Sequence, residues 1–152
     1  MTHLKSKSTT IAVLGGGSWG TALVKILTDN GHQVYWYIRD TRVIGHIQNT
    51  GHNPNYLTFA KLNLKYIQLS DDVKEVVNKS PNLLLAIPSA FIGPVLETIG
   101  DTLQTKTILS AVKGIVPETQ LVVGEHLLHL QVPKNQIGVI GGPSHAEEVA
   151  NE

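Results

Sequence analysis

The sequence has no cysteine among its 152 residues. It therefore has no disulfide framework, no thiolate nucleophile and no cysteine-ligated metal site, a composition that fits a reducing cytoplasm. Charge of one sign is not in excess either, because 12 lysines and arginines balance 12 aspartates and glutamates. This balance argues against a binder of nucleic acid or of an anionic membrane surface, so any bound phosphate has to be held locally.

Long apolar runs are also missing. A stretch such as residues 83–87 is far shorter than the roughly 20 residues that a membrane-spanning helix needs, and residues 1–10 lack the apolar run of a signal peptide. We expect a cytoplasmic protein without membrane insertion, with a flexible tail over residues 1–10 and one domain over residues 11–152. The seven histidines show no metal-ligand spacing, and His126 with His129 suits a polar helix face, so no metal is predicted.

Short apolar runs alternate with longer segments of helical pattern. Runs that are nearly continuous in apolar and β-branched residues are typical of parallel strands covered by helices on both faces. The order predicts an α/β fold of the Rossmann type, a doubly wound and mainly parallel sheet with right-handed crossovers. The expected strands are residues 11–14, 33–38, 67–69, 82–87, 107–111 and 136–140. The expected helices are residues 18–30, 42–49, 72–78, 90–103 and 118–130, with Asn30-Gly31 at a helix end and Ser70 or Asp71 as an N-cap.

A glycine motif follows the first expected strand. Gly15, Gly17 and Gly20 have the spacing G-x-G-x-x-G and lead directly into the first helix. Gly15 suits a tight turn, Gly17 lets a pyrophosphate approach the backbone, and Gly20 allows close packing of helix and strand. A three-glycine pattern alone also occurs in purely structural turns. Its position between a strand and a helix favours dinucleotide binding, with the phosphates at the helix N-terminus.

The second expected strand ends at Arg39 and Asp40, where such folds read the adenosine ribose. An acidic residue there accepts hydrogen bonds from the 2′-hydroxyl of NAD, whereas an arginine pairs with the 2′-phosphate of NADP. We favour Arg39 as the cofactor contact. Asp40 is instead a credible cap of the next helix, although a contact with the ribose remains open.

Three further segments follow later strands. Pro88 interrupts the fourth strand, either as an ordinary turn or as part of a nicotinamide site. Lys113 leaves the fifth strand beside a glycine, where it is either a solvated charge or a ligand of phosphate or substrate. Ser144 and Glu147 have the spacing of a capping box, which predicts a new helix whose start either holds a substrate or only continues the fold.

Taken together, these segments resemble NAD(P)-dependent glycerol-3-phosphate dehydrogenase, and they recur in the order of that family from residue 11 onward. The resemblance is much more specific than the glycine motif. It rests on residues 15–22 (GGGSWGTA), 39–40 (RD), 53–57 (NPNYL), 87–89 (IPS), 112–114 (VKG) and 142–148 (GPSHAEE).

The resemblance implies roles for individual residues. In the family, Lys113 contacts both cofactor and substrate, and Gly142 and Ser144 belong to the substrate site. His145 departs from the family, which commonly has an aromatic residue there. The cofactor site expected on this basis consists of Gly15, Gly17, Ser18, Trp19, Gly20, Arg39, Asp40, Tyr56, Pro88, Lys113 and Ala146.

The implied reaction is hydride transfer between NAD(P)H, with NADP favoured over NAD, and the pair dihydroxyacetone phosphate and sn-glycerol 3-phosphate, for glycerophospholipid synthesis. In the family a second, helical domain supplies the general acid/base lysine and much of the substrate pocket, and we expect this domain to lie outside the chain. A homodimer of the full-length protein is also expected. Two alternatives stay open, a free-standing dinucleotide-binding module and a related two-domain hydroxy-acid dehydrogenase.

Overall fold

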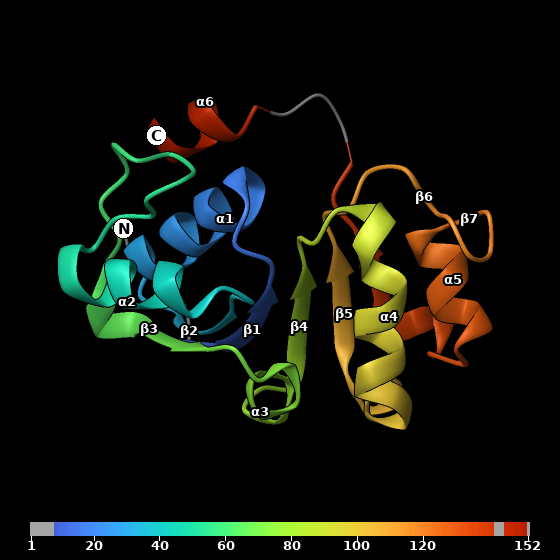
Figure 1. Cartoon of the computed structure of the whole chain (residues 1–152). Coiled ribbons are helices and arrows are strands. Elements are labelled where there is room, and N and C mark those ends of the chain that lie inside the picture. Colours follow the sequence, from blue (N-terminus) through green and yellow to red (C-terminus); the bar gives the residue numbers. More distant parts are fainter. Residues whose placement is uncertain (1–7, 142–144, 152) are drawn as a thin grey trace, which may run out of the picture.

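The computed structural model describes residues 8–141 and 145–151. Its centre is a six-stranded parallel sheet with strand order β3-β2-β1-β4-β5-β8 (Figure 1). This order places the reversal of winding between β1 and β4, the point at which doubly wound sheets bind ligands. The strands are β1 (Thr10–Leu14), β2 (Gln33–Tyr37), β3 (Ile67–Ser70), β4 (Asn82–Leu85), β5 (Thr107–Ser110) and β8 (Ile137–Val139).

Helices cover both faces of the sheet, as the sequence predicts. Side chains of α3, α4 and α5 pack on one face, and those of α1 and α2 pack on the other. The last helix, α6, lies against α1. The helices are α1 (Ser18–Asp29), α2 (Thr41–Thr50), α3 (Val73–Asn78), α4 (Ser89–Ile99), α5 (Val123–His129) and α6 (Ala146–Asn151), with 3-10 turns at Leu64–Tyr66, Gly100–Thr105 and Lys134–Gln136.

The residues of β1 show why the sheet needs both layers. Ala12 and Leu14 belong to the core under α3, α4 and α5, whereas Val13 belongs to the core under α1 and α2. All three side chains have 0% exposure. A strand buried on both faces reads as a continuous apolar run, which is the pattern that predicted a parallel sheet.

One predicted helix is wrong over its first half. Residues 118–122 do not begin a helix, because β6 (Ile115–Val116) and β7 (Leu121–Val122) form an antiparallel hairpin and α5 starts only at Val123. Gln120 adopts a positive φ of 58°, which no helix contains. Val116 is fully buried in the core beside α4, so tertiary packing outweighs the local helical pattern.

The other differences are at the ends of elements. α4 ends at Ile99, because the C-cap Gly100 has a φ of 63° that stops the helix before the predicted residue 103. Asn30 and Gly31 end α1 as predicted, but the N-cap of α3 is Asp72 rather than Ser70 or Asp71, since Asp72 accepts from the N–H groups of Lys74 and Glu75.

The folded part begins earlier than the sequence predicts. β1 starts at Thr10, and the Ser8 hydroxyl donates to the Gly31 carbonyl at 3.1 Å. Ser8 is therefore hydrogen-bonded to the turn that follows α1, and Thr10 already belongs to the sheet.

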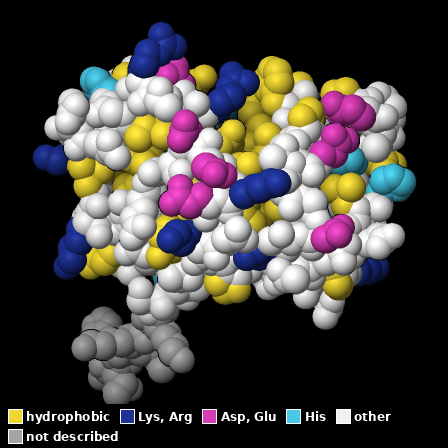
Figure 2. All heavy atoms as spheres, turned by 60° about the horizontal axis from the view of Figure 1, so that its bottom comes forward, with side chains coloured by type: hydrophobic (Ala, Val, Ile, Leu, Met, Phe, Trp, Pro, Cys, Tyr) yellow, Lys and Arg dark blue, Asp and Glu magenta, His cyan; other side chains and the backbone are white. Residues whose placement is uncertain are grey.

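The surface carries both signs of charge. On the face shown in Figure 2, side chains of Lys and Arg are interspersed with those of Asp and Glu, so this face presents no field of one sign. In the described part of the chain, no helix combines the length and the apolar character that crossing a bilayer requires. Within the same residues, no three His, Asp or Glu side chains gather closely enough to hold a metal ion.

Candidate dinucleotide site

The glycine turn lies at the carboxyl ends of β1 and β4, and two of its glycines are required by packing. Gly15 has a φ of 119°, and a Cβ there would lie 2.4 Å from the Ala86 carbonyl oxygen. A Cβ on Gly20 would lie 2.1 Å from the Gly15 carbonyl oxygen. Both contacts are far below van der Waals distance, so these glycines allow the turn, α1 and the end of β4 to approach closely.

Gly17 is different. Among the described residues, a Cβ on Gly17 would meet no atom within 4 Å, and its φ of −76° and ψ of −174° are open to any residue. No contact with these residues therefore requires a glycine at this position. A requirement for free space in front of the Gly17 backbone, by contrast, points to a ligand that approaches it closely.

The three carbonyl groups of this turn are each held by a buried side chain. Trp36 Nε1 donates to the Gly15 carbonyl at 2.8 Å, and Asn53 Nδ2 donates to the Gly16 carbonyl at 3.0 Å. Thr21 Oγ1 donates to the Gly17 carbonyl at 2.8 Å. Because all three carbonyl oxygens are engaged inside the protein, they do not face an approaching anion.

The start of α1 presents positive electrostatic potential beside the turn. Gly17 is the N-cap and provides no side-chain cap, and no acidic residue stands in the first turn. The first N–H groups of a helix have no intrahelical acceptor, and the helix dipole adds about half a positive charge at this end. Such an end binds phosphate, provided that the ligand can reach the backbone.

Two clefts meet at this turn, and each opens toward a different part of the sheet edge. The first has a volume of about 380 Å³ and extends from the turn toward the end of β2, where Arg39 lies. Its remaining walls are mostly apolar. The lining residues are Gly15, Gly16, Gly17, Tyr37, Arg39, Ala86, Ile87, Pro88, Ala90, Phe91, Pro94 and Val95.

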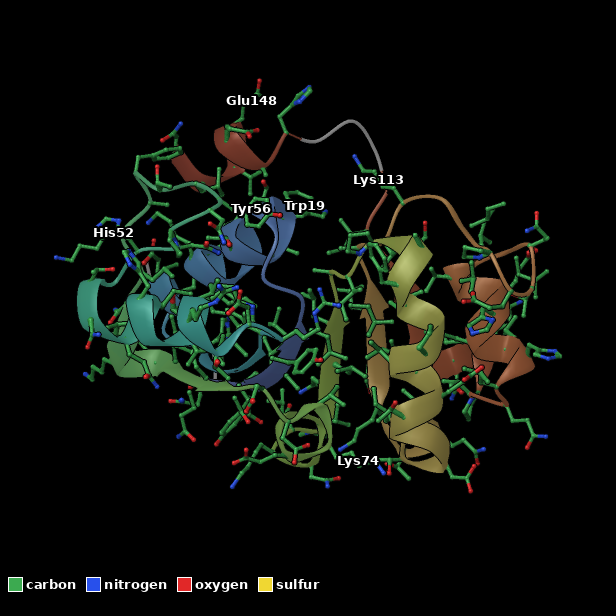
Figure 3. All side chains as sticks on the ribbon, in the orientation of Figure 1. Trp19, His52, Tyr56, Lys74, Lys113 and Glu148 are labelled. Carbon is green, nitrogen blue, oxygen red and sulfur yellow. The ribbon has the colours of Figure 1, made fainter. Side chains whose placement is uncertain are left out.

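The second cleft has a volume of about 350 Å³ and extends toward the end of β5. Ser18, Trp19 and Lys113 line it, and Gly17 and Pro88 line both clefts. Figure 3 shows Trp19 at the start of α1 and Lys113 on the segment that leaves β5. The structure thus brings seven of the predicted residues into one continuous region: Gly15, Gly17, Ser18, Trp19, Arg39, Pro88 and Lys113.

Arg39 and Asp40 are adjacent in sequence but have different surroundings. The Asp40 carboxylate caps α2 through the Arg42 N–H and forms two further hydrogen bonds with the Arg42 guanidinium, at 3.1 and 2.8 Å. These bonds lower the pKa of Asp40 to about 2. Arg39 is exposed and has no ion-pair partner among the described residues. The cap interpretation of Asp40 is confirmed, and Arg39 is the cation that lines the cleft.

Some predicted residues are not brought into the clefts. Tyr56 and Ala146 line neither of them, and the hydrophobic cluster that includes Trp19 and Ala146 also contains Leu57. In the view of Figure 3, the labels of Tyr56 and Trp19 both stand below α6, and Tyr56 is exposed. Their cofactor contacts remain predictions. Gly142 and Ser144, including the capping box, lie outside the described residues.

Sequence reasoning assigned no role to several residues of this region. Tyr37 and Phe91 line the first cleft, and Trp36 and Asn53 hold the glycine turn. Trp36 reads as one more apolar residue of β2, and its polar N–H gives no pattern signal. Asn53 stands in a segment without periodicity, so only the three-dimensional fold reveals that it reaches residue 16.

Comparison with known proteins agrees with this geometry. A family model described as NAD-dependent glycerol-3-phosphate dehydrogenase N-terminus matches residues 10–152. Among curated relatives, the chain is 36% identical over 141 residues to glycerol-3-phosphate dehydrogenase [NAD(P)+] of Ectopseudomonas mendocina, covering 93% of the chain and 41% of that protein. It is 39% identical over 144 residues to the enzyme of the same name from an Exiguobacterium species, covering 92% and 42%.

Solved structures show the same fold. Glycerol-3-phosphate dehydrogenase from Coxiella burnetii superposes with a TM-score of 0.77 at 28% identity, over 95% of this chain and 44% of that one. The enzyme from Saccharomyces cerevisiae gives a TM-score of 0.80 at 18% identity, over 95% and 45%, a likeness of fold. The chain spans about two fifths of the length of the curated relatives it matches. Its sequence and fold agree over this span, and the chain belongs to the family of NAD-dependent glycerol-3-phosphate dehydrogenase N-terminal domains.

Proposed function

We propose that the chain is the cofactor-binding part of a cytoplasmic oxidoreductase that interconverts dihydroxyacetone phosphate and sn-glycerol 3-phosphate with NAD(P)H. The observation that carries this proposal is the free space at Gly17, since no atom of the residues that the structure describes lies within 4 Å of a Cβ built there. A glycine that the fold does not need, at the N-terminus of a helix without an acidic first turn, fits a pyrophosphate.

The two clefts fit the two halves of a dinucleotide on either side of that point. In this proposal, the adenosine occupies the cleft of Arg39 and Phe91, and the nicotinamide occupies the cleft of Ser18, Trp19 and Lys113. When bound, the reduced nicotinamide supplies the hydride. Pro88 lines both clefts and would therefore border both halves of the dinucleotide.

Lys113 would hold the substrate in place. Its exposed ammonium offers donors to a substrate phosphate or carbonyl oxygen beside the second cleft. Gly142 and Ser144, on the segment after β8, would complete the substrate contacts. The proton for the substrate oxygen would come from a lysine in a helical domain outside these residues, and the full-length protein would form a homodimer and bind no nucleic acid.

The surroundings of Arg39 and Asp40 favour NADP over NAD. Arg39 is free to form two parallel, charge-assisted hydrogen bonds with a 2′-phosphate. Asp40, in contrast, already uses both carboxylate oxygens on Arg42. Its charge is therefore compensated by that guanidinium and does not oppose a 2′-phosphate.

Titration of NADPH and NADH into the chain tests the proposal. We expect both to bind, and we expect Gly17→Val to raise the dissociation constant of each about 100-fold or more, because two or more charge-assisted hydrogen bonds are lost. The thermal midpoint of Gly17→Val should stay near that of the unchanged chain. Gly45→Val is the matched control, since a Cβ at Gly45 also meets no atom within 4 Å but lies on α2, away from both clefts.

The same samples test where the catalytic group lies. We expect no appreciable reduction of dihydroxyacetone phosphate by the 152-residue chain with saturating NADPH. Turnover at the rate of a complete enzyme would place the acid/base group within these residues, and undiminished binding by Gly17→Val would refute the phosphate assignment. A longer reading frame without a helical domain and its lysine would favour the alternative of a free-standing dinucleotide-binding module.

A further inference from the structure

Asn53 is 37 residues from Gly16 in the sequence, yet its side chain reaches the glycine turn. The side chain has 0% exposure and uses its full hydrogen-bonding capacity. Nδ2 donates to the Gly16 carbonyl at 3.0 Å and to Thr21 Oγ1 at 2.9 Å. Oδ1 accepts from the N–H groups of Asn55 and Tyr56 at 3.0 and 3.3 Å. A buried amide with two donated and two accepted bonds has a single orientation.

Because the peptide bond is planar, a side chain that fixes a carbonyl group also fixes the direction of the next N–H group. In a trans peptide unit, the C=O of one residue and the N–H of the next point in opposite directions. Because Asn53 fixes the Gly16 carbonyl inside the protein, the N–H of Gly17 points away from Asn53, toward the open side of the turn. The Thr21 bond to the Gly17 carbonyl directs the N–H of Ser18 in the same way.

Asn53 therefore controls two amide donors. It holds the first peptide unit directly. It supports the second through Thr21, whose hydroxyl accepts from Asn53 and donates to the Gly17 carbonyl beside the helical bond from the Thr21 N–H at 2.9 Å. The peptide unit between Gly15 and Gly16 depends instead on Trp36, which donates to the Gly15 carbonyl. In a chain of bonds of this kind, removal of one member loosens the next.

The Oδ1 atom of Asn53 anchors the segment around Tyr56. Leu57 follows with a positive φ of 48°, a conformation that costs a non-glycine residue about 1–2 kcal/mol. This residue is nevertheless buried, and it packs with Ala22 of α1 and Ala150 of α6. The turn closed by Asn53 Oδ1 precedes this strained residue directly and helps to hold it.

We propose that Asn53 is a positioning residue that aims the N–H groups of Gly17 and Ser18 at the pyrophosphate of a bound dinucleotide. This inference rests on the proposed function, since it concerns the same site. It predicts that the loss of Asn53 weakens ligands that carry a pyrophosphate and spares ligands that occupy only the cleft of Arg39.

The experiment measures binding of NADPH and of adenosine 2′-monophosphate, which lacks the pyrophosphate, to the chain and its variants. For Asn53→Ala we expect the dissociation constant of NADPH to rise about tenfold or more, the loss of at least one charge-assisted hydrogen bond. The constant for adenosine 2′-monophosphate should stay within about twofold, because its contacts are on the Arg39 side. Asn55→Ala is the matched control, as Asn55 is exposed and keeps its main-chain N–H.

Thr21 provides an independent pair of variants if Asn53→Ala does not fold. Thr21→Ser keeps the hydroxyl and should bind NADPH like the unchanged chain. Thr21→Val removes the hydroxyl donor to the Gly17 carbonyl, leaves only the main-chain N–H of residue 21 on it, and should weaken NADPH severalfold. In the Asn53→Ala/Thr21→Val double variant, the increase in the dissociation constant of NADPH should be smaller than the product of the two single-variant increases. The reason is that both residues act on one hydrogen-bond network.

The possible failures are distinguishable. If the unchanged chain binds no dinucleotide, the proposed function is wrong and this inference with it. If the unchanged chain binds NADPH and Asn53→Ala binds it equally well, only the inference is overturned. Equal losses for NADPH and adenosine 2′-monophosphate, or equal behaviour of Thr21→Ser and Thr21→Val, would overturn it too, by showing a general structural role.

Discussion

The glycine turn and the region around the hairpin of β6 and β7 differ in how their polar groups are satisfied. In the turn, three successive carbonyls each accept a hydrogen bond from a side chain. Beside the hairpin, His126 is buried at 4% exposure, and its Nε2 atom has no partner among the described residues. A fully bonded turn has one conformation, whereas an unpaired buried group costs stability.

The largest expected effect separates the two kinds of glycine in the turn. Gly20→Ala should destabilise the fold by about 3 kcal/mol or more, because its Cβ would lie 2.1 Å from the Gly15 carbonyl oxygen and main-chain atoms would have to move. Gly17→Ala should lower the free energy of unfolding by about 1 kcal/mol or less, since alanine clashes with none of the described residues there and is only a poorer N-cap than glycine. Urea denaturation of both variants measures this difference.

Similar stability of the two variants would contradict the close packing of α1 on the turn. The contrast also separates folding from binding. Gly20→Ala should lose dinucleotide binding only to the extent that the protein unfolds. Gly17→Val should lose dinucleotide binding although the protein stays folded. Far-ultraviolet circular dichroism at the temperature of the titrations distinguishes the two.

The same contrast explains what the sequence could predict. The strands and the turn are readable because apolar runs and glycines act locally, through burial and φ, and the strand bounds agree within two residues. The hairpin is not readable, because its short strands depend on the burial of Val116 under α4. Asn53 likewise acts through two hydrogen bonds that span 37 and 32 residues of sequence, and no periodicity marks such a residue.

Arg39 gives the next largest effect. Arg39→Ala should weaken NADPH about 10- to 100-fold, since hydrogen bonds between charged groups contribute roughly 1.5–3 kcal/mol. NADH has no 2′-phosphate, so its affinity should change much less. Titrations of both cofactors at one fixed ionic strength measure this, because salt screens exposed charges. Equal losses for the two cofactors would leave Arg39 as a stacking or structural residue.

His126 should make the hairpin region sensitive to acid. Burial, assisted by the nearby His129, lowers the pKa of His126 below 6.5, although Glu118 and Glu97 oppose this. Below about pH 6.5 the unfolded chain then binds more protons than the folded chain, so this contribution to stability is present above that pH and decreases as the pH falls.

The measurement is the thermal midpoint between about pH 7.5 and pH 5.5. His126→Leu should show a smaller decrease over this range than the unchanged chain, because it has no group to protonate there. His46→Leu is the control, since His46 is exposed on α2. The same decrease in His126→Leu and in the unchanged chain would show that His126 does not cause the acid sensitivity.

Asp40 should give the smallest effect, although it is adjacent to Arg39. Asp40→Asn should leave the affinities for NADPH and NADH within about twofold, because asparagine caps a helix about as well as aspartate and the carboxylate is already bound to Arg42.

The effect of Asp40→Asn should instead appear in the stability of the fold at acidic pH. The pKa of Asp40 is lowered to about 2 from 3.8, so its contribution is present above pH 3.8 and is lost as the pH falls through about 2. The stability difference between the unchanged chain and Asp40→Asn should therefore shrink over that range. Tighter NADPH binding by Asp40→Asn would instead mean that the carboxylate faces the 2′-phosphate, and Arg39 and Asp40 would then act against each other in cofactor choice.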